Sequence, residues 1–96
     1  MKTEIWNGHQ IRFVEKGGEW WAVAKDVAEA LGYSHTPHML RLIDPKDKGT
    51  DFVDTNGGEQ EMVIISEFGI CEAFFNSRKP EAKEFKRWLY HSVLKS

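Results

Sequence analysis

Apolar residues recur along this chain with two periods, and the helical period is clearest over residues 24–31. Its apolar stripe has the spacing i, i+3, i+4 and i+7 and consists of Ala24, Val27, Ala28 and Leu31. This spacing predicts an amphipathic helix. The charged positions expected to face water are Lys25, Asp26 and Glu29. Gly32 follows the last apolar position, where a helix readily ends through a left-handed residue.

A second short helix is predicted soon after this glycine. Thr36 is a good N-cap, Pro37 suits the first helical position, and apolar residues continue to about Ile43. The Asp44-Pro45 step then ends the helix. Two helices joined by a tight glycine turn are typical of a helix-turn-helix, so we expect such a pair over about residues 24–43.

Alternation with a period of two predicts three strands before this helical pair. They are residues 3–6, 9–14 and 20–23. The Asn7-Gly8 step between the first two is a strong hairpin signal, and a Gly-Gly step precedes the third. Ile11 and Phe13 alternate with Gln10, Arg12 and Val14. One face of an antiparallel meander is therefore expected to be buried.

The rest of the chain predicts a polar loop, a second hairpin and two helices. The loop covers residues 45–50, and the hairpin turns at residues 56–58 between residues 52–53 and 60–65. Ser66 is a good N-cap for a helix over residues 67–75, in which Gly69 lowers the helix propensity. A final helix from about residue 80 to 94 has an apolar stripe made of Ala82, Phe85, Trp88, Leu89 and Val93. The predicted fold is α+β: a small antiparallel sheet, from the meander and the second hairpin, packed with four short-to-medium helices.

Composition bounds the class of protein. Ninety-six residues, 41% hydrophobic and 12% aromatic, are enough for one domain with a real core. A single cysteine excludes an internal disulfide and fits a reducing cytosol. No apolar run reaches the roughly 20 residues that span a bilayer, and the N-terminus lacks an apolar signal core. We therefore expect no membrane contact and a cytoplasmic location.

The charge is unevenly distributed, although the net charge is only −2. Residues 1–43 carry five Lys/Arg and five Asp/Glu, residues 44–72 carry two and eight, and residues 73–96 carry six and two. A polyanion should therefore prefer the last segment, with net charge +4, and avoid the middle one, with net charge −6.

Two segments resemble a known family. Residues 21–33, WAVAKDVAEALGY, are similar to its "W/F-x-A-K-D-V-A-x-A-L-G-Y" segment, and residues 77–89, SRKPEAKEFKRWL, followed by Val93-Leu94, are similar to its "S-x-K-P-x-A-K-x-F-x-x-W-x-x-x-x-V-L" segment. The family is the BRO N-terminal domain of phage and prophage antirepressors, and the resemblance covers nearly the whole chain. It implies an α+β domain that binds DNA, has no enzyme activity and helps to relieve repression of lytic genes. The family usually continues past "V-L-P" into a second domain, whereas Lys95 stands at the proline position here. Residues 1–96 are thus expected to be one such domain, either from a longer protein or as a short family member.

The first hypothesis is a DNA-binding module. In the helical pair, the polar side chains expected to face a groove are His35, His38 and Arg41. In the last segment, the cations expected to contact phosphates are Arg78, Lys79, Lys83, Lys86 and Arg87. The structural alternatives are an ordinary helical hairpin packed on the sheet and a solvated charged helix face. The acidic middle segment does not suit simple docking of a winged-helix type.

The second hypothesis is a protein-interaction module whose acidic hairpin binds a basic phage repressor. The residues expected to make this contact are Asp47, Asp51, Asp54, Glu59 and Glu61. In this reading the carboxylates stand in for DNA phosphates. A homodimer is compatible with either hypothesis, because two-fold DNA sites favour two-fold proteins.

Other chemistry finds little support in the sequence. A zinc site from His35, His38, Cys71 and His91 lacks a second closely spaced ligand pair, and the aspartates of residues 44–54 lack the spacing of a calcium loop. No paired carboxylates, activated nucleophile or phosphate loop stands out, so neither catalysis nor a cofactor is expected. The tryptophans suit core packing better than base stacking, although one ring of the Trp20-Trp21 pair should point outward and is a candidate for an interface.

Overall fold

Five antiparallel strands form one sheet in the computed structural model, which describes residues 1–77 and 82–94 and, within the second range, the side chains of 83, 84 and 87–91. The strands are β1 (Lys2–Trp6), β2 (His9–Lys16), β3 (Glu19–Val23), β4 (Lys48–Thr55) and β5 (Gly58–Ile65). Their spatial order is β1-β2-β3-β5-β4. The predicted meander and second hairpin are confirmed, and pairing of Ala22 with Ile65 and of Val23 with Ile64 joins them into one sheet.

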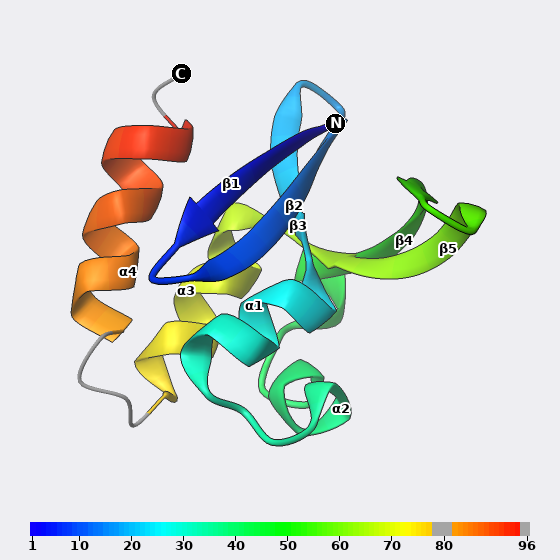
Figure 1. Cartoon of the computed structure of the whole chain (residues 1–96). Helices are drawn as coiled ribbons and strands as arrows, with labels where there is room; N and C mark the ends of the chain where they lie inside the picture. The colour runs from blue at the N-terminus through cyan, green and yellow to red at the C-terminus, as the bar shows by residue number, and fades with distance from the viewer. Residues whose placement is uncertain (78–81, 95–96) are drawn as a thin grey trace.

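Four helices pack with this sheet, as the α+β prediction required (Figure 1). They are α1 (Ala24–Leu31), α2 (Thr36–Leu40), α3 (Glu67–Phe75) and α4 (Ala82–Trp88), and a π-helical stretch (Leu89–Leu94) continues α4. Figure 1 places α4 on the left of the molecule and the β4–β5 hairpin projecting on the right. The last helix and the acidic hairpin therefore lie at opposite ends of the fold.

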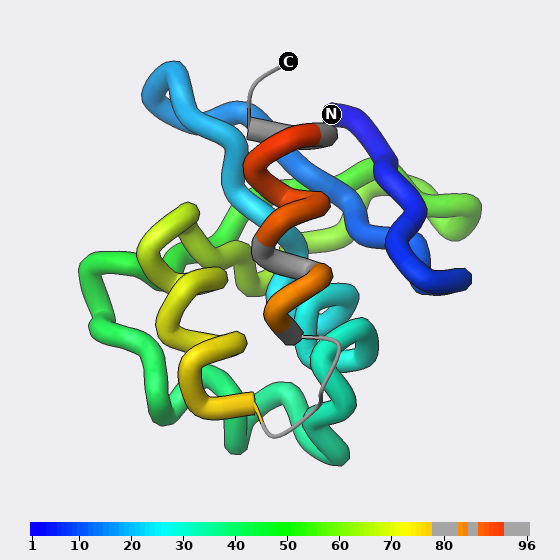
Figure 2. The backbone as a smooth tube through the Cα atoms, turned by 90° about the vertical axis from the view of Figure 1, so that its left-hand side faces the viewer, coloured from blue at the N-terminus to red at the C-terminus, as the bar shows by residue number. Residues whose placement is uncertain are grey.

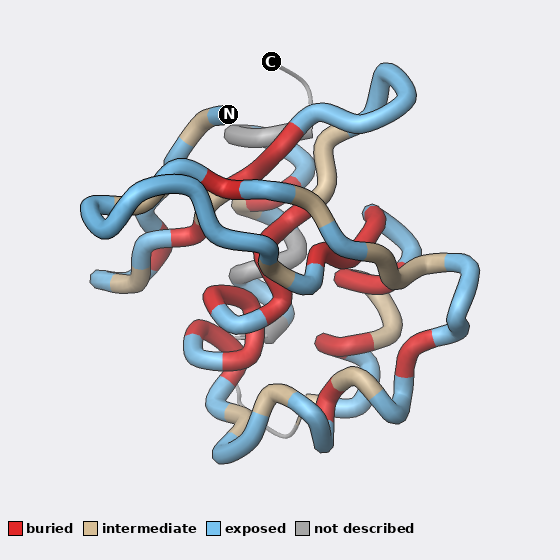
Figure 3. Tube along the Cα trace, turned by 90° about the vertical axis from the view of Figure 1, so that its right-hand side faces the viewer, coloured by how far each residue is buried: buried red, intermediate tan, exposed pale blue. Residues whose placement is uncertain are grey.

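The main core lies between the sheet and the helices. It contains Ile11, Phe13 and Ile65 from the sheet, Leu31 from α1 and Leu89 from the end of the chain, all nearly or fully buried (Figure 3). The burial of Ile11 and Phe13 confirms the buried face predicted for β2. Each of these side chains removes apolar area from water, which is the main favourable term in folding.

The other face of the sheet has a small apolar cluster that the alternation alone did not predict. Val14, Val23, Val53 and Ile64 are buried there, and Trp21 and Met62 pack against them. Trp20 packs instead against the main core, so the two rings do point to opposite faces. Both rings are half-buried, with Lys2 Nζ 4.3 Å from the Trp20 ring and Lys16 Nζ 5.5 Å from the Trp21 ring. The Trp21 ring thus packs on the sheet and is not fully exposed to solvent.

Asp26 corrects the expectation that the charged positions of α1 face water. Lys25 and Glu29 are exposed, but Asp26 is only 6% exposed. Its Oδ2 accepts hydrogen bonds from the Arg12 backbone N–H at 2.9 Å and from Arg12 Nε at 2.8 Å, and its Oδ1 accepts from Nη2 at 2.9 Å. β3 turns into α1 at Val23, so the backbone of β2 at Arg12, which pairs with Thr3 of β1, lacks a strand partner on its β3 side, and Asp26 provides one.

The turn between α1 and α2 confirms the glycine signal and corrects two boundaries. Gly32 has φ 81°, and the Tyr33 N–H donates to the Ala28 carbonyl at 2.9 Å, as in a left-handed helix end. The N-cap of α2 is His35 rather than Thr36, and its side chain makes no capping bond. The helix also ends at Leu40 rather than near Ile43. Its end is fixed by Lys48, whose Nζ donates to the Leu40 carbonyl at 2.8 Å.

The start of α3 shows why its cap and its glycine matter. Ser66 Oγ accepts from the Gly69 N–H at 3.2 Å, which confirms the predicted N-cap, and donates to Asp47 Oδ1 at 2.8 Å. A Cβ at Gly69 would lie 3.0 Å from the Asp47 carbonyl oxygen and 3.1 Å from Ile65 Cβ. Part of the predicted polar loop is regular structure, since residues 45–47 form a 3₁₀ turn and β4 begins at Lys48.

The final helix is confirmed over its described part. Leu89 is buried and Trp88 is half-buried, as the apolar stripe predicted. The side chains of Ala82, Phe85 and Val93 lie outside those that the structure describes, as do residues 80 and 81. None of the described helices is long and apolar enough to cross a membrane.

Candidate nucleic-acid interface

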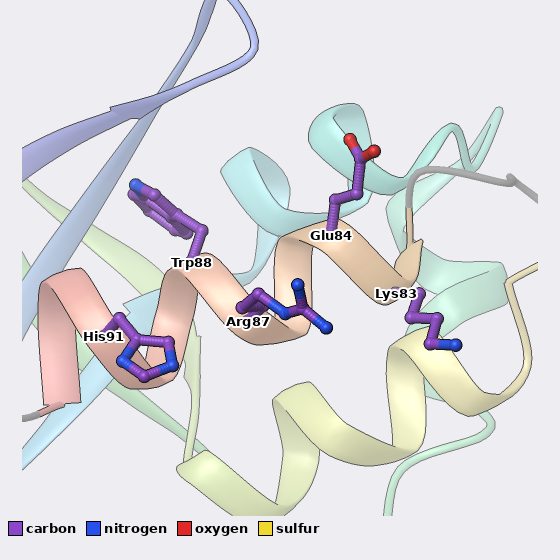
Figure 4. Close-up of a pocket in the computed structure, with 5 residues that line it drawn as sticks. All are labelled: Lys83, Glu84, Arg87, Trp88 and His91. Carbon is purple, nitrogen blue, oxygen red and sulfur yellow. The ribbon is translucent and has the colours of Figure 1, made fainter.

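A row of basic side chains runs along one side of the last helix. Lys83, Arg87 and His91 are spaced by four residues and all three are exposed. Figure 4 shows them on the same side of the helix, whereas Glu84 and Trp88 point to the other side. The same five residues line a hollow in the surface. Because one helical residue rises 1.5 Å, neighbouring members of the row are about 6 Å apart along the axis.

Glu84 lines the same hollow, but none of Lys83, Arg87 and His91 is within salt-bridge distance of a described carboxylate. The ion pair that the described side chains show joins Arg12 to Asp26 at 2.8 Å, at the junction of β2 and α1. We call Lys83, Arg87 and His91 the cationic row, because the lysine and the arginine give it its charge. An exposed row of this kind attracts anions, and the attraction weakens as salt screens it.

The other predicted phosphate contacts cannot be placed in this row. Arg78 and Lys79 lie outside the described residues, and so does the side chain of Lys86. Two of the five predicted cations, Lys83 and Arg87, are therefore brought together on one helix side. His91 joins them although it was considered only as a zinc ligand. The signal that could have found it is its spacing of four residues from Arg87.

The predicted groove-facing residues lie on and beside α2. His35, His38 and Arg41 are exposed, and the His38 ring lies 6.4 Å from that of Tyr33 between ring centroids. The helix has five residues and is therefore only about 7.5 Å long. Arg41 is its C-cap and the one arginine among the three. α2 thus offers few donors for reading bases.

The helical pair and the cationic row occupy different parts of the surface. Viewed from the side of α4, Figure 2 shows α3 to one side of it, α1 to the other and α2 at the bottom of the molecule. α4 and α2 therefore do not lie side by side in this view. The projecting hairpins do not cover either set (Figures 1 and 2).

The five predicted acidic contacts divide into two groups. Asp47 is half-buried and holds Ser66, and Asp51 Oδ1 accepts from the Phe52 N–H at 2.8 Å. Asp54, Glu59 and Glu61 are exposed, and Asp54 lies directly opposite Glu59 in the β4–β5 register. Cross-strand partners share a face of the sheet, and so do residues two apart on one strand. Asp54, Glu59 and Glu61 therefore project from one face of the hairpin, and Asp51 from the other.

Perturbed pKa values do not mark a catalytic site. The pKa of Arg12 is raised by its hydrogen bond with Asp26, and burial raises the pKa of Tyr33, whose hydroxyl donates to the Ala73 carbonyl. The pKa of Tyr90 is raised, chiefly by the charge of the nearby Cys71. Among the described residues, no three His, Cys, Asp or Glu side chains are grouped as a metal site.

Comparison with known families decides the assignment. Residues 10–95 match the model of the BRO family, N-terminal domain. The chain belongs to the BRO family. Such domains occur in phage antirepressor-like proteins and are not an enzyme family. The resemblance carried by residues 21–33 and 77–89 is therefore confirmed.

One curated relative of this BRO domain is an uncharacterized protein of Haemophilus influenzae. It is 34% identical over 78 residues, which cover 80% of the BRO domain described here and 39% of the relative. The chain thus spans about two fifths of the length of that protein. No solved structure matches the chain.

Proposed function

We propose that this BRO domain binds double-stranded DNA through the cationic row of α4, as the regulatory module of a phage or prophage antirepressor that controls lytic genes. The observation that carries the proposal is the exposed row of Lys83, Arg87 and His91 on one helix side, none of them in a salt bridge with a described carboxylate. Successive phosphates of one DNA strand rise by about 3.4 Å along the duplex axis and also turn around it, so they lie farther apart than this rise. Cations about 6 Å apart on α4 therefore suit contacts with successive phosphates. Family membership supports the same role.

In this proposal α2 contributes sequence preference rather than affinity. His35, His38 and Arg41 are exposed, and Arg41 is the one arginine among them, so they add little to the attraction of a polyanion. Because α2 and α4 lie on different parts of the fold, we expect a bent duplex or a second copy when both surfaces are used together. Phosphate contacts by α4 are therefore the primary event.

A mobility shift with a short duplex at low salt tests the cationic row. The double variant Lys83→Ala/Arg87→Ala removes two phosphate contacts, and we expect its affinity for DNA to fall at least about tenfold. The matched control is Lys25→Ala/Lys46→Ala, which removes the same charge from exposed positions on α1 and the 3₁₀ turn. Equal weakening by both variants would mean that only net charge matters and would defeat the assignment.

A second function is favoured by the carboxylates that gather on one face of the projecting hairpin. We propose as the alternative that Asp54, Glu59 and Glu61 bind the basic DNA-contacting surface of a phage repressor. Complementary charge gives such a contact its specificity and fast association. The role of Asp47 and Asp51 in this contact is smaller, because the first holds the α3 cap and the second projects from the other face.

Co-purification with the repressor discriminates the two functions. If the hairpin is the contact, Glu59→Lys/Glu61→Lys should lose the repressor while Lys83→Ala/Arg87→Ala keeps it. Binding of DNA in the absence of any repressor favours the first function. A domain that shifts no DNA yet retains the repressor establishes the second.

A further inference from the structure

One face of the β4–β5 hairpin exposes apolar side chains that a monomer leaves in water. Phe52 lies opposite Glu61, and Thr50 lies opposite Val63, so Phe52 and Val63 are diagonal neighbours on the same face. Phe52 is 57% exposed and Val63 is 37% exposed. The opposite face packs against the rest of the sheet through Val53 and Ile64. We call the exposed side the Phe52 face.

The charge around the Phe52 face selects a cationic occupant. Asp54, Glu59 and Glu61 project from the same face, and residues 48–65 contain one lysine and four acidic residues. In a symmetric dimer formed through this face, the carboxylates of one copy would lie against those of the other, and their repulsion costs free energy. An aromatic ring in an acidic frame instead suits a guanidinium or ammonium group, which can pair with a carboxylate and lie over the ring.

The same chain carries a surface of the required charge at its other end. The cationic row of α4 lies across the molecule from the hairpin, so the two cannot meet within one copy (Figure 1). Its members follow one another about every 6 Å along the helix, and Glu59 and Glu61, two residues apart on a strand, are about 7 Å apart. The spacings of anions and cations therefore agree to within about 1 Å.

We propose that copies of this chain associate head to tail, with the Phe52 face of one copy on the cationic row of the next. In this contact Glu59 and Glu61 pair with Lys83 and Arg87, and the Phe52 ring lies against the Arg87 guanidinium. A heterologous contact of this kind leaves one free hairpin and one free row at the ends, so association continues into short chains. Because few side chains are buried, the contact is weak and depends on salt.

The contact also regulates DNA binding, and this consequence rests on the function proposed above. The hairpin of one copy and the phosphates of DNA occupy the same cationic row. DNA therefore disperses the chains, and a high concentration of the protein opposes binding of DNA. At one end of each head-to-tail assembly the cationic row is free, so the copy at that end can still bind DNA.

Sedimentation velocity of the whole chain at low salt, over a range of concentrations, tests the contact. We expect the average mass to rise with concentration and to return to the monomer as salt is added. Glu59→Lys/Glu61→Lys and Lys83→Glu/Arg87→Glu should each weaken association at least about tenfold, because each places like charges in the contact. Phe52→Ser keeps every charge and should weaken it severalfold. The control Glu15→Lys/Glu19→Lys makes the same charge change at exposed positions of β2 and β3, and it should weaken association much less than Glu59→Lys/Glu61→Lys does.

Mixing the two reversed variants gives the decisive result. Each should be monomeric alone, and an equimolar mixture should associate. In the mixture the hairpin of each variant meets a row of opposite charge on the other variant. A wild-type chain that stays monomeric at low salt, or a mixture that does not associate, overturns the proposal. Phe68 is an exposed apolar side chain of α3. Association that survives both reversals but is lost in Phe68→Ser would place the contact on α3 and overturn the proposal as well. If a short duplex fails to disperse chains that the reversals do disrupt, the head-to-tail contact stands and the proposed DNA contact falls.

Discussion

At the scale of single residues, the fold depends on side chains that satisfy backbone groups where regular pairing stops. Asp26 holds the backbone and guanidinium of Arg12 where β2 extends beyond β3. Lys48 binds the end of α2 through the Leu40 carbonyl, and Ser77 Oγ donates to the Leu31 carbonyl at the end of α1 at 3.0 Å. Buried backbone groups without partners cost free energy, so these side chains fix how the helices join the sheet.

Asp26 offers the sharpest test at this scale. In Asp26→Asn the amide keeps the shape of the side chain, but it replaces a charged acceptor with an N–H₂ that opposes the Arg12 donors. We expect a loss of about 2 kcal/mol in the free energy of unfolding, measured by urea denaturation. Glu29→Gln makes the same chemical change at an exposed position of α1 and should stay within about 0.5 kcal/mol of the wild type. Equal effects of the two variants would show that the Arg12–Asp26 pair contributes nothing specific.

At the scale of elements, α3 depends on a close approach that only glycine permits. A Cβ at Gly69 would meet the Asp47 carbonyl oxygen at 3.0 Å, Ile65 Cβ at 3.1 Å and Ile43 Cγ2 at 3.2 Å. The 3₁₀ turn, β5 and Ile43, which follows α2, therefore converge on the first turn of α3. Two of these neighbours are backbone or Cβ atoms, which cannot move without moving their elements.

Gly69→Ala should accordingly destabilise the domain, although alanine is the better helix former by up to about 1 kcal/mol. Overpacking against a fixed neighbour costs typically about 1–3 kcal/mol, so we expect a net loss of about 1 kcal/mol or more in chemical denaturation. Gly57→Ala is the matched control, since its Cβ would find its nearest neighbours at 3.7 and 3.8 Å. If Gly69→Ala is instead as stable as the wild type, the close packing of α3 is not a constraint.

The elements themselves were largely predictable, because each depends on a local signal. Asn7-Gly8 and the alternation of β2 predicted the first hairpin, and Gly32 and Ser66 marked the end of α1 and the start of α3. What the sequence could not show depends on partners distant along the chain. Asp26 is buried by Arg12, 14 residues away, and α2 is ended by Lys48, 8 residues beyond Leu40.

The candidate surfaces were predictable only in their composition. The sequence indicated an acidic hairpin and a basic last helix, but the β4–β5 register decides that Asp54 and Glu59 share a face that Asp51 does not. The sequence alone did not place His91 in the row with Lys83 and Arg87, because it indicated this histidine only as a candidate metal ligand. Face and register are set by pairing, which composition does not report.

At the scale of the whole molecule, charge is separated along the fold. The hairpin, residues 48–65, carries one lysine and four acidic residues, a net charge of −3, whereas residues 73–96 carry +4, and Figure 1 places the hairpin and α4 at opposite ends. A molecule of this kind is oriented by a polyanion, with α4 toward the phosphates and the hairpin away from them. The same separation underlies the head-to-tail contact, so DNA binding and self-association are two uses of one cationic surface.

The salt dependence of DNA affinity tests this picture most directly. For the wild type and each variant, the slope of log K against log salt counts the phosphate contacts, at about 0.9 per contact on duplex DNA. Lys83→Ala/Arg87→Ala should reduce the magnitude of the slope by about 1.8, and Lys25→Ala/Lys46→Ala should leave it unchanged. A slope that is the same for the wild type and for Lys83→Ala/Arg87→Ala would contradict a phosphate contact by α4 and, with it, the proposed function.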